Sequence, residues 1–184
     1  MTGDQPPTES LIDLGCGIGQ LSLELVQRGV QTATGVDITP RVISTAKQLA
    51  EMKKLGERCT FIEGDIRKTD LTPADTVIMD RVLHFNPDQD LLLRQVASLA
   101  KRRLIISLPL EGMRSRLAWL LLSARIRVRI YLLSIRMIDD VLRGEGFDRV
   151  AKWDDKTNRL TRWTILAYKR DPTRNYVALS RTSS

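Results

Sequence analysis

Apolar segments of strand length alternate with segments of helical periodicity along the first two thirds of the chain. Residues 11–14 form an apolar run, and after a glycine-rich turn residues 21–28 place leucines and a valine at helical spacing. The same pattern predicts further strands at residues 31–36, 59–63, 76–79 and 103–108. Alternation of this kind is typical of a parallel sheet with right-handed crossover helices.

Two more helices lie between these strands. Thr39 can cap one of them with Pro40 in its first position and Gly56 beyond its end. Asn86 can cap the other, which is predicted over residues 87–100.

The last third of the chain breaks this rhythm. Residues 112–124 look helical and residues 125–131 alternate basic with apolar side chains, but a single amphipathic helix fits the same stretch. Ser134 can cap a short helix that ends near Gly144, and residues 147–154 and 160–168 are predicted as a hairpin around the turn DKTN. The predicted fold class is therefore α/β: a doubly wound, mostly parallel, Rossmann-like sheet of seven strands with a C-terminal antiparallel hairpin.

A length of 184 residues suits one domain, which we place at residues 1–170, with a polar and mobile tail at residues 171–184. The longest apolar run, residues 117–122, is too short for a membrane span, and the N-terminus lacks the pattern of a secretory signal. Cys16 and Cys59 show no disulfide spacing. We therefore expect a cytoplasmic protein without disulfides.

The net charge of +7 favours anionic partners. Basic residues are interleaved with acids along the chain, so a solvated basic surface explains most of this charge. One denser cluster, Arg114, Arg116, Arg125, Arg127 and Arg129, suits either an acidic, amphiphilic acceptor or peripheral contact with an anionic membrane.

Three alternating glycines, Gly15, Gly17 and Gly19, follow the first strand and precede a helix. Such a turn lets the backbone approach a ligand, and the helix N-terminus favours an anionic group on it. Dinucleotides and S-adenosylmethionine are the two ligand classes that use this device. A dinucleotide fingerprint needs glycine where this chain has Gln20, which disfavours the alternative of a dinucleotide-dependent reductase.

The stretch DLGCGIG resembles the first motif of class I S-adenosylmethionine-dependent methyltransferases. The resemblance implies that Asp37, in GVD, accepts hydrogen bonds from the ribose hydroxyls, and that Asp65, in FIEGDI, receives the adenine amino group with Ile66 beside the ring. It implies a cofactor site for S-adenosyl-L-methionine formed by Asp13, Gly15, Cys16, Gly17, Gly19, Asp37, Ile38, Gly64, Asp65, Ile66 and Asp80.

The segments DTVIMDRVLHFNPD, LAKRRLIISLP and GEGFDRVAKW look like those of magnesium-protoporphyrin O-methyltransferases and related enzymes. This resemblance implies methyl transfer to a small-molecule acceptor, most often at oxygen. Members of that family generally carry N-terminal helices that cover the site, whereas here about ten residues precede the first strand. The second hypothesis is a non-catalytic cofactor-binding subunit that depends on a partner. An oligomer, in which another subunit covers the site, is a further expectation.

Methyl transfer to a carboxylate needs no base, because that acceptor is already ionised at neutral pH, whereas a phenol gains from one. His84 and Asp80, at the end of the fourth strand, are the candidate catalytic residues, although either can have a purely structural role. No metal site is predicted. Nucleic-acid methylation ranks third, because the sequence after the fourth strand is MDRV and aromatic residues make up only 5% of the chain.

Overall fold

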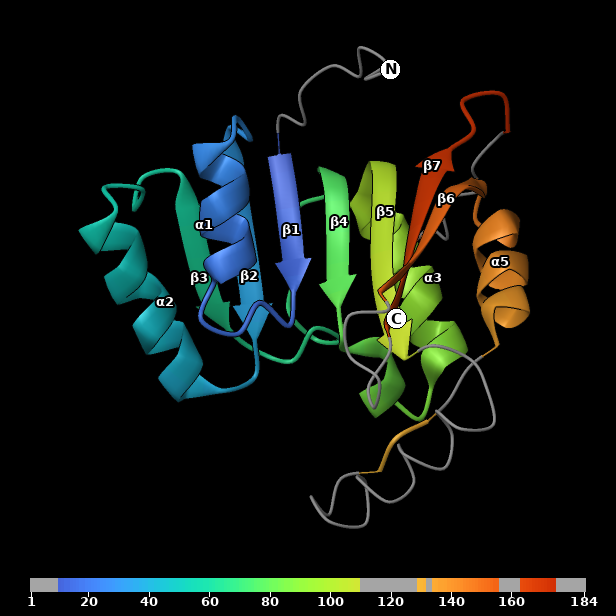
Figure 1. Ribbon diagram of the computed structural model, residues 1–184, viewed down its shortest axis with the longest axis horizontal. Coiled ribbons are helices and arrows are strands. Elements are labelled where there is room, and N and C mark those ends of the chain that lie inside the picture. The colour runs from blue at the N-terminus through green and yellow to red at the C-terminus, as the bar shows by residue number, and fades with distance from the viewer. Residues whose placement is uncertain (1–9, 110–128, 132–133, 156–162, 175–184) are drawn as a thin grey trace, which may run out of the picture.

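A seven-stranded sheet organises the protein. The computed structural model describes residues 10–109, 129–131, 134–155 and 163–174, and the strands are ordered β3-β2-β1-β4-β5-β7-β6 (Figure 1). Their bounds are β1 (Ser10–Leu14), β2 (Thr32–Asp37), β3 (Cys59–Glu63), β4 (Ala74–Asp80), β5 (Ala100–Pro109), β6 (Phe147–Asp155) and β7 (Trp163–Arg170). The first five strands pair in parallel, and β7 lies antiparallel between β5 and β6. The predicted fold class is confirmed.

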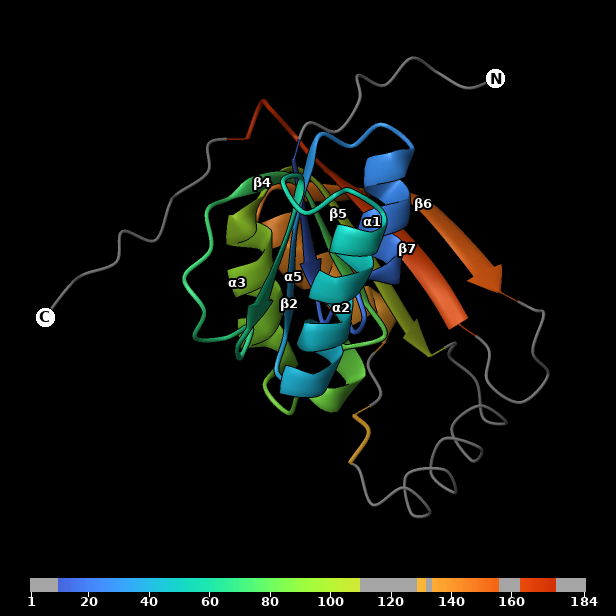
Figure 2. The same cartoon turned by 90° about the vertical axis from the view of Figure 1, so that its left-hand side faces the viewer.

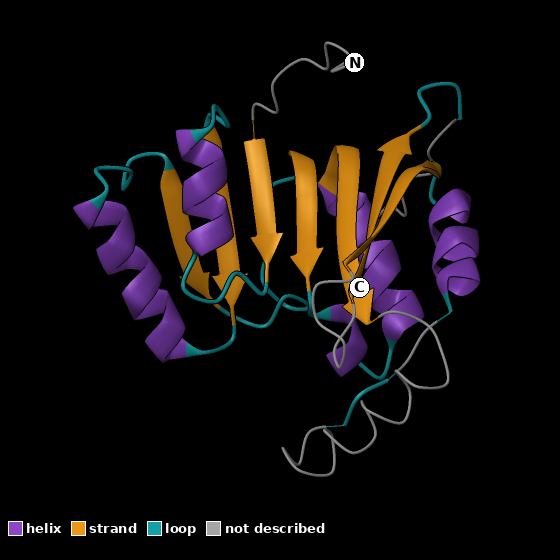
Figure 3. Ribbon diagram, viewed as in Figure 1, coloured by secondary structure: helices purple, strands orange, loops and turns teal. Residues whose placement is uncertain are grey.

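Helices lie on both faces of this sheet. Figure 2 shows α1 (Gln20–Gln27) and α2 (Pro40–Met52) on one side, and α3 (Gln89–Leu99) on the other. Helix α5 (Ile135–Gly144) packs beside α3, and a single 3-10 turn, η1 (Leu83–Phe85), follows β4 (Figure 3). Among the described helices, none is long and apolar enough to span a membrane.

Two hydrophobic cores fill the layers. The core beneath α3 and α5 includes Leu104, Ile106 and Leu142, all fully buried. The core beneath α1 and α2 is built around Ala46 and Phe61. Both cores leave the carboxyl ends of β1, β2 and β4 together at one edge of the sheet, where the strand order reverses between β1 and β4 (Figure 1). Ligands of open α/β sheets bind at such an edge.

The start of α3 differs from the prediction. The helix begins at Gln89 rather than Pro87, because the Asn86 side chain accepts a hydrogen bond from the Asp88 backbone N–H at 2.8 Å and forms a turn. Asp88 takes the N-cap position. Thr39 is the N-cap of α2 as predicted, although its side chain makes no capping bond.

Most of the ambiguous segment, residues 112–133, lies outside the described residues, as does the tail beyond residue 174. Residues 129–131 are described, and they form neither helix nor strand, so a single amphipathic helix does not extend through them. Tyr131 is tied to η1 and α3, since its N–H donates to the His84 carbonyl at 2.7 Å and its carbonyl accepts from the Gln89 side chain at 2.9 Å.

Arg170, at the end of β7, forms hydrogen bonds to three other parts of the fold. Its guanidinium donates to the carbonyls of Ala97, Ala100 and Glu145 at 2.9–3.3 Å and lies 4.2 Å from the centre of the Phe147 ring. The last described strand is thereby attached to the ends of α3 and α5.

Candidate active site

A cavity of about 600 Å³ lies at the carboxyl edge of the sheet. Seven of the residues predicted to bind a cofactor line it: Gly15, Asp37, Ile38, Gly64, Asp65, Ile66 and Asp80. Its other lining residues were not among the predicted site residues: Thr39, Arg67, Arg81, Val82, Phe85, Asn86 and Pro87. A volume of this size is typical of sites for small molecules.

The glycine turn joins β1 to α1 and is held in place by hydrogen bonds to β2. The N–H groups of Gly15 and Cys16 both donate to the Val36 carbonyl, at 2.7 and 3.1 Å. A Cβ on Gly19 would come within 2.4 Å of the Phe61 ring, whereas a Cβ on Gly17, at φ 54°, would meet nothing within 4 Å. Only one of these two glycines leaves open space, so Gly17 is the position where a ligand can approach the backbone.

Asp37 connects the end of β2 to this turn. One carboxylate oxygen accepts from the Gly17 N–H at 3.0 Å, and the other accepts from the Thr39 N–H at 2.9 Å. Each oxygen keeps a lone pair for a further donor. The carboxylate is therefore held in one orientation on the cavity wall and can still accept two hydroxyl groups.

Asp65 is held by Arg67, two residues further along. The arginine donates to it through the backbone N–H at 3.0 Å, Nε at 3.0 Å and Nη2 at 2.6 Å. These hydrogen bonds lower the pKa of Asp65 to about 2, so its carboxylate is ionised at neutral pH. Neighbouring Ile66 is partly buried and lines the same wall.

Asp80 ends β4 and forms a cluster with two neighbours. The Ser107 hydroxyl donates to its carboxylate and accepts from the Arg81 backbone N–H at 2.8 Å. Arg81 also donates through Nε to Asp80 at 3.0 Å, and its guanidinium lies 5.6 Å from the centre of the Trp163 ring. Arg81 adopts φ 57°, an unfavourable conformation for a residue with a side chain.

Asp13 is 2% exposed and does not line the cavity. It accepts a hydrogen bond from the Ser22 hydroxyl at 2.7 Å, which ties β1 to α1. Burial raises its pKa to about 6, an effect that the Ser22 bond opposes and the nearby charges of Asp80 and Asp37 reinforce.

Cys16 and His84 do not line the cavity either. Burial, with the charges of Asp13 and Asp37, raises the pKa of the Cys16 thiol to about 12. His84 is 1% exposed, packs against Phe85 and Trp163, and has its pKa lowered to about 4 by burial. A neutral, enclosed imidazole is poorly suited to act as a base on an acceptor in the cavity.

Sequence reasoning missed the contributions of Arg67 and Ser107. Ser107 had a usable signal, because it lies at the carboxyl end of the strand next to β4 and is paired in register with Asp80. Arg67 had none, since an arginine two residues after an acid is common on solvated surfaces.

The model of a family described as a methyltransferase domain matches residues 7–120. The chain is 33% identical over 97 residues to magnesium-protoporphyrin O-methyltransferase of Synechocystis sp., a match over 52% of this chain and 42% of that protein. It is 35% identical over 81 residues to carboxy-S-adenosyl-L-methionine synthase of Chromohalobacter salexigens, over 42% of this chain and 30% of that protein. Both matches span less than half of the relative's length.

The crystal structure of magnesium protoporphyrin IX methyltransferase from Synechocystis with bound SAH is similar in fold. Its TM-score is 0.75 at 27% sequence identity, over 90% of this chain and 75% of that one.

Proposed function

The chain belongs to the methyltransferase domain family, and we propose that it binds S-adenosyl-L-methionine at the carboxyl edge of the sheet and transfers the methyl group to an oxygen atom of a small-molecule acceptor. The observation that carries this proposal is the orientation of Asp37 by Gly17, because it places a two-oxygen acceptor on the wall of a cavity of suitable size.

The residues present fit the cofactor. Asp37 would accept both ribose hydroxyls, and Ile38, 69% exposed, offers an apolar surface beside them. Asp65 is ionised and oriented, and it keeps lone pairs for an amino group while Ile66 lies next to it. The open space at Gly17 suits the methionine end of the ligand, close to the N-terminus of α1.

When bound, S-adenosyl-L-methionine supplies a methyl group on a positively charged sulfur. The chain's own task is to hold an acceptor oxygen about 3 Å from that methyl group, in line with the sulfur, and to keep water out. Arg81, Val82 and Phe85 also line the cavity. An apolar wall with one guanidinium suits an acidic, partly apolar acceptor.

A carboxylate acceptor fits this wall better than a phenol. Asp80 is already engaged by Ser107 and Arg81, and His84 is neutral and buried. Neither group is placed to take a proton from an acceptor, and a carboxylate has none to lose at neutral pH. The Synechocystis relative named as an O-methyltransferase supports the same acceptor atom.

The test is a calorimetric titration of the full chain with S-adenosyl-L-methionine, S-adenosylhomocysteine and NAD. We expect both adenosyl ligands to bind and NAD not to bind. Asp37→Ala should weaken their binding by about 30-fold to 1000-fold, since two hydrogen bonds to a charged acceptor contribute roughly 2 to 4 kcal/mol. Asp90→Ala, which removes a surface acid of α3, is the control and should leave the affinity unchanged.

Two outcomes would contradict the proposal. Binding of NAD without the adenosyl ligands would indicate a dinucleotide enzyme. Binding of S-adenosyl-L-methionine without methylation of any carboxylate or hydroxyl acceptor would favour the non-catalytic, partner-dependent subunit.

A further inference from the structure

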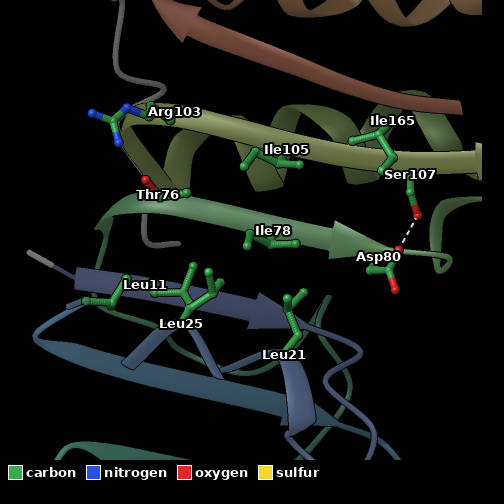
Figure 4. A pocket seen from close by; sticks show the side chains of 11 residues that line it. Leu11, Leu21, Leu25, Thr76, Ile78, Asp80, Arg103, Ile105, Ser107 and Ile165 are labelled. Atoms are coloured by element: carbon green, nitrogen blue, oxygen red, sulfur yellow. Dashed lines mark hydrogen bonds between the residues drawn. The ribbon is translucent and has the colours of Figure 1, made fainter. Parts of the chain in front are cut away.

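Two acids that line the candidate active site, Asp80 and Asp65, are held in different ways. Asp80 is held by another strand, since the Ser107 hydroxyl of β5 donates to its carboxylate (Figure 4). Asp65 is held by Arg67, two residues further along the same loop. This second contact joins no two elements of the fold, and partly exposed ion pairs contribute little to stability. Its effect therefore falls on the Asp65 carboxylate itself.

Arg67 occupies most of the hydrogen-bonding capacity of this carboxylate. Its backbone N–H and Nε both donate to Oδ1 at 3.0 Å, and Nη2 donates to Oδ2 at 2.6 Å. An ionised carboxylate has about four lone-pair sites, so one site remains, and it lies on Oδ2. The Asp65 side chain, which lines the cavity, is 18% exposed. It therefore presents one free acceptor site in a fixed direction.

The backbone of this loop is held without the Arg67 side chain. The Asp65 carbonyl accepts from the N–H and the hydroxyl of Thr69, both at 2.9 Å. The Gly64 N–H donates to a carbonyl of β2 at 3.0 Å, and Ile66 packs against the core beneath α3 and α5. Removal of the guanidinium should therefore let the carboxylate turn while the loop keeps its path.

An acceptor that is fixed in direction can distinguish purines by the group at position 6. A 6-aminopurine presents an N–H donor there, whereas a 6-oxopurine presents an acceptor oxygen and carries its donor on N1. An ionised carboxylate can only accept, so the oxygen of a 6-oxopurine would face it without a hydrogen bond. A carboxylate that is free to turn could accept from the N1–H instead. Selectivity at position 6 therefore requires a carboxylate that cannot turn.

We propose that Arg67 is a positioning residue, which gives the cofactor site its selectivity for a 6-aminopurine over a 6-oxopurine by fixing the direction of the Asp65 carboxylate. This role rests on the proposed function, in which the base of S-adenosyl-L-methionine lies beside Asp65 and Ile66. Arg67 acts through Asp65 and needs no contact with the ligand.

The experiment is a calorimetric titration of the full chain with S-adenosylhomocysteine and S-inosylhomocysteine, which differ only at N1 and position 6 of the base. The wild type should bind the adenosyl ligand roughly 30-fold to 100-fold more tightly, since the inosyl ligand leaves a charged acceptor without its hydrogen bond. In Arg67→Ala this ratio should fall about tenfold, because the carboxylate can then turn toward the N1–H. Arg67→Lys should recover only part of the ratio, since an ammonium group lacks the planar fork that holds both oxygens.

Arg28→Ala is the matched control. Arg28 also donates through Nε to a nearby acid, Glu24 of α1, at 2.7 Å, but it does not line the cavity. Its removal should leave the ratio of the two affinities unchanged. Thermal denaturation should show both arginine variants to be about as stable as the wild type, so that a change in the ratio reports on the site and not on the fold.

A double-mutant cycle separates positioning from direct contact. Asp65→Ala should itself remove most of the selectivity, and the addition of Arg67→Ala should then change neither affinity further. A ratio that still changes with the second substitution would mean that Arg67 contacts the base itself, which overturns a role through Asp65.

The remaining outcomes distinguish a failure of this role from a failure of the proposed function. If neither ligand binds the wild type, the proposed function is wrong and the role of Arg67 is wrong with it. If S-adenosylhomocysteine binds, but the wild type does not discriminate or Arg67→Ala keeps the full ratio, the cofactor site stands and only the role of Arg67 is refuted.

Discussion

The carboxylate of Asp37 accepts a hydrogen bond at 3.0 Å from the backbone of Gly17, twenty residues earlier in the chain. The contact joins the end of the second strand to the turn that follows the first. The position of the Asp37 carboxylate therefore depends on the conformation of the glycine turn. Changes in the turn should reduce ligand affinity more than they reduce the stability of the fold.

Gly17→Ala tests this dependence. The added methyl group meets nothing within 4 Å, so the cost to stability should be the roughly 1 to 2 kcal/mol of an alanine at positive φ. The same methyl group would occupy space that the ligand needs, and we expect the affinity for S-adenosylhomocysteine to fall at least about tenfold. Calorimetry and chemical denaturation measure the two effects.

Gly19→Ala is the contrasting variant. Its methyl group would come within 2.4 Å of the Phe61 ring in the core beneath α1 and α2. Overpacking adds about 1 to 3 kcal/mol to the cost of positive φ, so this variant should lose clearly more stability than Gly17→Ala. Equal losses for the two would show that Gly17 is not an open position.

Asp13→Asn should raise the free energy of unfolding at neutral pH. Burial raises the pKa of Asp13 to about 6 from 3.8, so ionisation above pH 6 costs stability, and acidification restores it. Between about pH 7 and 4.5 the wild type should gain about 2 kcal/mol from this group, and the variant should lack that gain. Urea denaturation across this range is the measurement, and an unchanged slope with pH would contradict it.

His84→Phe should show the opposite pH dependence. Burial lowers the pKa of His84 to about 4 from 6.5, so the neutral form stabilises the fold at pH 7 and this stabilisation is lost as the pH falls through that interval. The loss between about pH 7 and 4.5 is about 2 kcal/mol, close to the gain from Asp13. The wild type should therefore be nearly insensitive to pH there, Asp13→Asn should lose stability on acidification, and His84→Phe should gain it.

Arg67→Ala should raise the pKa of Asp65. The three hydrogen bonds from Arg67 keep the pKa of this carboxyl near 2, and without the guanidinium two of them disappear. Carbon-detected NMR of the side-chain carboxyl should show the pKa rising toward its ordinary value, with only partial recovery in Arg67→Lys. Asp171, whose pKa is lowered by hydrogen bonds from Thr173, is an internal control whose pKa should not change.

Ser107→Ala should cost about 1 to 2 kcal/mol, because the hydroxyl both donates to Asp80 and accepts from the Arg81 backbone. Ser98→Ala removes an exposed hydroxyl that bonds only to a carbonyl of its own helix, and should change the stability little. Thermal denaturation of the two variants compares them. A similar small effect for both would mean that water replaces the Ser107 hydroxyl at no cost.

Local patterns were sufficient to predict most of the fold. The strands were predicted close to their observed bounds because apolar residues cluster in some of them and alternate with polar residues in others. The position of β7 between β5 and β6 was not predictable in this way, since both strands of the hairpin alternate similarly and the register with β5 depends on contacts some sixty residues apart. The start of α3 was missed because Asn86 bonds within a turn instead of capping the helix.

The residues of the candidate site likewise fall into those that the sequence placed correctly and those whose surroundings it did not reveal. Asp37 ends β2 and Asp65 lies two residues after β3, and both acids that the family resemblance indicated line the cavity. His84 follows a strand too, but Trp163 from a distant strand packs against it, and no local signal reports such burial. Asp13 is enclosed for a comparable reason, since α1 folds back over it and Ser22 contacts it.

The insertion of β7 between β5 and β6 has a consequence for synthesis on the ribosome. Strands β1 to β4 are complete once residue 80 has emerged, but β5 acquires its outer neighbour only from residues 163–170. Until then β5 is an open edge with unpaired backbone groups, and β6 has no strand to join. A nascent chain stopped before Trp163 therefore presents a template for aggregation, and release of Arg170 completes both the sheet and its attachment to α3 and α5.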